Sequence, residues 1–105
     1  MAQSALGIMY ANGKGVAEND AEAVKWYRLA AGQGNARAQT LLGDKYANGE
    51  GAPARKIDAY FWWNLAAARE NADAKKFKEL IEKTMTREQI AEAQRRSAAW
   101  KPKKE

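Results

Sequence analysis

The chain of 105 residues contains neither histidine nor cysteine. Imidazole is the commonest general base and metal ligand near neutral pH, and thiolates hold most structural zinc sites. The serine nucleophiles are limited to Ser4 and Ser97, and no imidazole is present to activate either of them. We therefore expect no catalytic residue, no metal site and no bound cofactor.

The acidic residues and the glycine-rich segments form no recognisable chemical motif either. A calcium loop needs carboxylates at fixed spacing, whereas those of this chain are scattered. The segments GKGVAEND and GEGAPARK contain glycine pairs, as phosphate-binding loops do. A phosphate-binding loop, however, follows a strand and ends in Lys-Ser or Lys-Thr. Here the glycines follow predicted helices and no such pair occurs, so we expect turns.

The dominant feature is an internal repeat, in which residues 2–36 recur as residues 38–72. A period of about 20 to 50 residues predicts a solenoid, whose units bury their apolar faces against their neighbours. The residues that recur in the second copy are Ala38, Gln39, Leu42, Gly43, Tyr46, Ala47, Asn48, Gly49, Gly51, Ala59, Trp62, Leu65, Ala66, Ala67, Asn71 and Ala72. We therefore predict one all-α domain.

Each repeat is predicted to be two helices joined by a glycine-containing loop, because apolar residues recur at helical spacing. A third copy begins at Ala72 but loses the Leu-Gly pair and the Gly-x-Gly loop. There Thr86 and Gln89 have the spacing of a capping box, which predicts a closing helix that stops before Pro102. The expected helices in the first two copies cover residues 2–12, 20–33, 36–48 and 56–69.

Three finer expectations concern the tryptophans and one turn. Trp26 and Trp62 recur beside small alanines, so we assign both to the core, together with Trp63. Trp100, at the end of the last helix, is expected to be half exposed. Asn71 is expected to take the left-handed turn that Gly34 provides in the first copy.

The net charge of +5 comes from the C-terminal part of the chain. Residues 1–73 carry eight basic and eight acidic side chains, whereas residues 74–105 carry ten basic and five acidic ones. A basic end can attract nucleic acid or another anionic polymer. The alternative is an ordinary solvated helix face, because glutamates are interleaved among the lysines and arginines at helical spacing.

The pattern Ala-Gln-x-x-Leu-Gly-x-x-Tyr-x-x-Gly-x-Gly, followed by Ala-x-x-Trp-(Tyr/Trp)-x-x-Ala-Ala, resembles the Sel-one-like repeat family. The segment MTREQIAEAQRRSAAW is similar to the closing helix of such arrays. The resemblance implies a right-handed α–α superhelix related to tetratricopeptide repeats, and a non-catalytic adaptor that binds a protein or peptide. We expect repeat one over 2–37, repeat two over 38–73, a degenerate third repeat with a capping helix over 74–101, and a basic tail over 102–105.

Equivalent positions that differ between the copies are candidates for partner binding, because they need not serve packing. By the resemblance, the first helix of each pair lines the concave face, which gives the candidates Ile8, Met9, Asn12, Asp44, Lys45 and Asn48. Simple surface variation is the alternative explanation. The main alternative function is docking of residues 75–104 on nucleic acid or an anionic envelope polymer.

Two further expectations concern association and location. The helix over 2–12 is predicted to leave Leu6, Ile8 and Met9 partly uncovered, which favours self-association. The alternative is a monomer with a frayed first helix. The sequence shows neither a membrane span nor a signal peptide. The expected compartment is the cytoplasm or, if an upstream signal peptide has been removed, the periplasm or the exterior.

Overall fold

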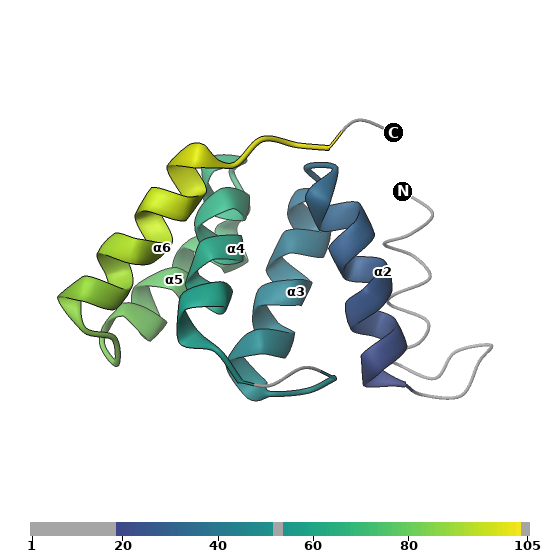
Figure 1. Cartoon of the computed structure of the whole chain (residues 1–105), viewed down its shortest axis with the longest axis horizontal. Helices are drawn as coiled ribbons and strands as arrows, with labels where there is room; N and C mark the ends of the chain where they lie inside the picture. The colour runs from purple at the N-terminus through teal and green to yellow at the C-terminus, as the bar shows by residue number, and fades with distance from the viewer. Residues whose placement is uncertain (1–18, 52–53, 104–105) are drawn as a thin grey trace.

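The computed structural model describes residues 19–51 and 54–103. Helices are the regular secondary structure in these ranges, which contain no strand. The helices lie side by side in chain order as a helical solenoid, and Figure 1 shows the C-terminal segment running back from the end of α6 toward α2. The helix bounds agree with the sequence pattern to within one or two residues. The described helices are α2 (Asp20–Gly32), α3 (Ala36–Asn48), α4 (Lys56–Ala68), α5 (Ala72–Glu82) and α6 (Arg87–Ala99).

Asparagine side chains start several of the helices, as expected for residues that accept from free backbone N–H groups. The Asn35 side chain accepts from the N–H of Ala38, and Asn71 does the same one repeat later. The predicted capping box of Thr86 and Gln89 is present at the start of α6. Arg55, which precedes α4, makes no side-chain cap. The helix starts are therefore largely encoded by local sequence.

The expected left-handed turn at Asn71 was wrong. Asn71 has a φ of −74° and caps α5, whereas the preceding Glu70 has a φ of +70°. Glu70 therefore takes the conformation that Gly34, with a φ of +97°, takes in the first copy. The backbone geometry of the repeat survives the loss of glycine because the N-cap residue must stay extended, so the residue before it has to turn.

Small alanines and a few large side chains build the core between the helices. Tyr27 and Trp63, which occupy equivalent positions in α2 and α4, are only 2% and 5% exposed. Trp26 and Trp62, one residue earlier, are only partly buried, so the expectation of full burial in the core was wrong, although Trp62 still packs against the core. Adjacent helix positions point about 100° apart, and it is the position of Tyr27 and Trp63 that faces into the core.

Gly43 explains the Leu-Gly pair of the repeat. The Trp63 ring lies directly against it, so that an added Cβ would overlap the indole Nε1 and lie 2.6 Å from Cδ1. In this position the indole N–H donates to the carbonyl oxygen of Thr40 at 3.0 Å. The glycine thus lets α4 approach α3 closely enough for the indole to reach the backbone.

Tyr60 of α4 joins the degenerate third repeat to the array. Its hydroxyl donates to Glu82 Oε1 of α5 at 2.7 Å and accepts from Gln94 Nε2 of α6 at 3.3 Å. Burial, followed by the Glu82 hydrogen bond, raises the pKa of Tyr60, which keeps the hydroxyl protonated as the donor. None of the described helices is long and apolar enough to span a membrane.

Candidate functional site

The described serine and the described carboxylates lie apart from one another in their contacts. Ser97 donates its hydroxyl hydrogen to the carbonyl oxygen of Ala93, within its own helix. No group of three or more acidic side chains that could hold a metal ion occurs in residues 19–51 and 54–103. Ser4 lies outside the described residues. The remaining candidates for function are surfaces that could bind a partner.

The first such surface is on α3, where Asp44 lies partly buried beside Trp63. Burial raises the pKa of Asp44 to about 6, against the opposing effects of the Trp63 indole and the Lys45 ammonium group. None of the ion pairs among the described residues includes Asp44. An ionised carboxylate in such a position lacks full hydration, so an incoming cation would stabilise it.

The two other described candidates on α3 differ in accessibility. The Lys45 ammonium group pairs with Asp20 at 2.8 Å and lies 3.8 Å from Glu50, and its side chain is only 13% exposed. Lys45 therefore joins α3 to the start of α2. Asn48 is exposed and donates to Glu50 Oε1 at 3.4 Å. Asp44 and Asn48 are four residues apart and thus share one helix face.

The remaining candidates belong to the first copy of the repeat. Ile8, Met9 and Asn12 lie outside the described residues, as does the predicted helix over 2–12 whose self-association we expected. Their proximity to α3 therefore stays a prediction.

A shallow hollow of about 260 Å³ lies next to Trp63 and continues onto α5. Phe77 packs against the Trp63 ring at 5.4 Å between ring centroids, and the neighbouring Leu80 is 51% exposed. The same tryptophan therefore adjoins both the Asp44 carboxylate and an exposed apolar group.

Several of the C-terminal cations are engaged within the protein. Arg96 pairs with Glu92 and Asp58, and Arg95 pairs with Glu92. Lys78 donates to Asn64 Oδ1 and lies over the Tyr60 ring. These contacts lower the number of cations that could neutralise the phosphates of a nucleic acid.

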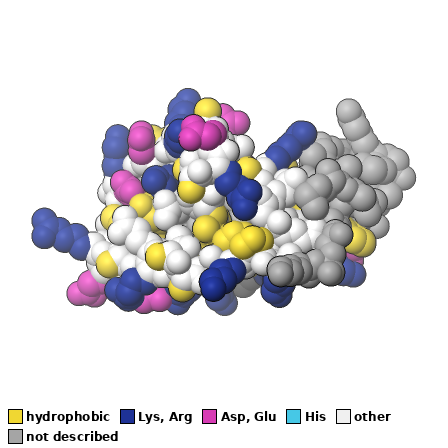
Figure 2. Space-filling view, turned by 90° about the horizontal axis from the view of Figure 1, so that it is seen from above, with side chains coloured by type: hydrophobic (Ala, Val, Ile, Leu, Met, Phe, Trp, Pro, Cys, Tyr) yellow, Lys and Arg dark blue, Asp and Glu magenta, His cyan; other side chains and the backbone are white. Residues whose placement is uncertain are grey.

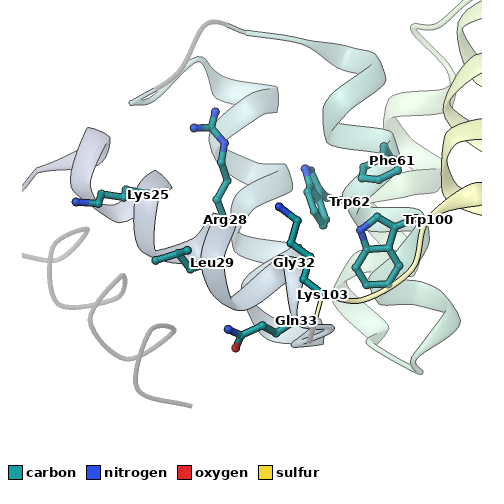
Figure 3. Close-up of a pocket in the computed structure, with 9 residues that line it drawn as sticks. All are labelled: Lys25, Arg28, Leu29, Gly32, Gln33, Phe61, Trp62, Trp100 and Lys103. Atoms are coloured by element: carbon teal, nitrogen blue, oxygen red, sulfur yellow. The ribbon is translucent and has the colours of Figure 1, made fainter. Parts of the chain in front are cut away.

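The larger hollow, which we call the α2–α4 groove, has a volume of about 630 Å³. Its apolar wall consists of Phe61 and Trp62 from α4 and Trp100 from the end of α6, and Leu29 of α2 lies across from them (Figure 3). The rings pack edge to face: Phe61 and Trp62 are 4.8 Å apart at 81°, and Trp62 and Trp100 are 6.3 Å apart at 77°. Trp100 is partly buried, as expected.

The C-terminal segment closes one end of this groove. The backbone N–H of Lys103 donates to the carbonyl oxygen of Gly32, the last residue of α2, at 2.7 Å. This bond satisfies one of the carbonyl groups that a helix leaves free at its C-terminus. Seen from above in Figure 2, hydrophobic side chains gather in the middle of this face, with Lys and Arg side chains around them.

The sequence pattern does not predict the α2–α4 groove. The recurrence of Trp62 drew attention to packing, and Trp100 and Lys103 lie outside the two full copies. The local features that hint at this groove are Leu29 on α2 and Trp100 next to the basic tail. No sequence pattern indicates that the tail returns to α2.

Comparisons with known proteins support the solenoid architecture. The model of the Sel1 repeat matches residues 1–35 and 36–71. A protective antigen of uropathogenic Escherichia coli strains, described as displaying an SLR fold, is similar over 91% of this chain and 21% of its own, with 33% identity and a TM-score of 0.89. A Sel1 repeat protein from Oxalobacter formigenes is similar over 74% of this chain and 59% of its own, with 40% identity and a TM-score of 0.73.

The chain thus spans about a fifth of the first of these proteins and less than two thirds of the second. No curated protein matches it. The two matched repeats together cover more than half of the chain, and the fold agrees with both solved structures. This protein belongs to the Sel1 repeat family.

Proposed function

We propose that this chain is a non-catalytic protein-interaction module that binds a protein or peptide through the face of α3. Sel1 repeats are generally protein-interaction modules, and the chain contains two of them. The observation that carries the choice of face is the partly buried Asp44 carboxylate, whose pKa is raised to about 6. A partner's lysine or arginine would pair with it and remove the cost of its incomplete hydration.

The surroundings of Asp44 support a partner with mixed chemistry. Asn48 lies one helical turn further on and is exposed, so its amide can exchange hydrogen bonds with a bound backbone. On the other side, the Trp63 ring leads to the exposed Leu80. The expected partner therefore presents a basic side chain next to an apolar one. In this proposal Lys45 holds α3 against α2, and Ile8, Met9 and Asn12 extend the surface.

The proposal is tested by affinity capture from a bacterial lysate with matched variants. Asp44→Asn removes the charge with little change of shape, and Asn48→Arg adds a cation at an exposed position. Ala98→Arg adds the same charge at an exposed position on α6 and serves as the control. A specific partner should be retained by the wild type and the control and lost with both α3 variants. Equal capture by all four proteins would refute the choice of face.

A partner found in this way allows a second test. Since a cation pairs with the ionised carboxylate, binding measured by calorimetry should strengthen as the pH rises through about 6. The Asp44→Asn variant should lose this dependence. If the wild type binds equally well at pH 5 and pH 7, Asp44 is not the anchor.

A further inference from the structure

We propose that the α2–α4 groove is a second interaction site, which takes an acidic peptide segment bearing a bulky apolar side chain. This site is independent of the face of α3, because its lining comes from α2, α4 and the C-terminal segment. Its volume of about 630 Å³ falls within the range of about 300–1,000 Å³ that is usual for ligand sites. The remaining evidence comes from its apolar wall and its charge.

The apolar wall is suited to a single inserted side chain. Leu29 is 45% exposed, so its side chain is available to contact a bound group. It lies opposite Phe61, Trp62 and Trp100, whose edge-to-face packing makes a concave wall (Figure 3). A leucine or phenylalanine of a peptide would bury its surface between these groups, and aromatic pockets of this kind dominate the energetics of many interfaces.

The charge of the groove selects an acidic peptide. Lys25, Arg28 and Lys103 line it, and none of the lining residues within 19–51 and 54–103 is acidic. None of these cations takes part in an ion pair among the described residues. The Arg28 guanidinium group is held in place by the Tyr46 hydroxyl, to which its Nη2 and Nε donate at 2.6 and 3.1 Å. A fixed guanidinium group retains further N–H donors for a carboxylate.

The same observations favour a peptide over a nucleic acid. Proteins that bind single strands offer ring faces for successive bases and a row of cations along the backbone. Here the rings pack edge to face against one another and the cations surround one hollow. Carboxylates flanking one apolar side chain therefore match the groove better than a chain of phosphates.

The test uses the full chain and a capped hexapeptide, Glu-Asp-Phe-Leu-Asp-Glu, which contains no tryptophan. Titration followed by NMR should shift the indole N–H signals of Trp62 and Trp100, and calorimetry gives the affinity. The double variant Lys25→Glu/Lys103→Glu should weaken binding at least about tenfold. The matched control Lys76→Glu/Lys83→Glu carries the same charge change at exposed positions of α5 and its C-terminal end, and should change binding less than twofold.

Three comparisons can overturn the proposal. A peptide in which serine replaces Phe and Leu must bind much more weakly, because equal binding would reduce the effect to charge alone. A thymidine hexanucleotide must bind more weakly than the peptide, because tighter binding would assign the groove to nucleic acid. Finally, an absence of indole shifts at millimolar peptide, or equal effects of the two double variants, would show that the groove does not bind this class of ligand.

Discussion

Alanine at position 43 should destabilise the protein, although alanine is the better helix former. Gly43 lies inside α3, so helix propensity alone predicts a gain of about 1 kcal/mol. The added Cβ, however, would overlap the Trp63 ring, which is only 5% exposed and donates to Thr40. Overpacking costs about 1–3 kcal/mol, and an indole N–H that loses its buried partner costs about 1–3 kcal/mol more. We expect a net loss of about 1–5 kcal/mol.

The assay is urea denaturation followed by circular dichroism. Gly32→Ala is the matched control, because the nearest atom to its added Cβ is Lys103 Cδ at 4.0 Å. It should leave stability unchanged or raise it by up to about 1 kcal/mol. Trp63→Phe should reduce the cost of Gly43→Ala in a double-mutant cycle, because the clashing nitrogen is gone. Unchanged stability of Gly43→Ala, with an unshifted Trp63 indole signal, would refute the steric explanation.

The other predictions concern two turns and one titration. Gly51→Ala should lower the free energy of unfolding more than Gly49→Ala. Both glycines have a positive φ, but only at Gly51 would an added Cβ overlap the backbone of Asp20 and Ala21. Equal losses of stability in the two variants would contradict this. Glu70→Gly should stabilise the protein by about 0.5–1 kcal/mol, because a positive φ costs a residue with a side chain about 1–2 kcal/mol. The exposed ion pair between Glu70 and Lys75, which this variant loses, contributes less than that. A lower melting temperature would contradict this. Because the folded pKa of Asp44 is raised from 3.8 to about 6, its neutral form favours folding, and stability from this group should fall as the pH rises between about 4 and 6. Asp44→Asn should abolish that part of the pH profile in urea titrations, whereas Glu88→Gln, at an exposed position on α6 that does not contribute to the raised pKa of Asp44, should leave it in place.

Local patterns predicted the helices and most of their caps because each depends on a few neighbouring residues. Asn35, Asn71 and Thr86 act on N–H groups two or three positions away. The choice between Trp62 and Trp63 for the core was not local. Both positions belong to one broad apolar face of α4, and the ring that lies against Gly43 of α3 is that of Trp63.

The face of α3 and the α2–α4 groove also differ in how far they depend on contacts between distant parts of the chain. Asp44 and Asn48 could be proposed from the sequence because they belong to repeat positions that can be compared between the two copies. The α2–α4 groove depends on a contact between Lys103 and Gly32, which lie at opposite ends of the described chain. Sequence periodicity carries no information about such a contact.

The bond between Lys103 and Gly32 also bears on how the protein unfolds. In a repeat array each unit touches only its neighbours, so terminal units can melt independently of the rest. Here the segment that follows α6 is hydrogen-bonded to the end of α2, through Lys103 and Gly32. The contact connects the first and the last of the described helices. Loss of α2 therefore also breaks this contact of the C-terminal segment. The bond should therefore make unfolding more cooperative than in an open array, and folding slower than its helical content alone suggests.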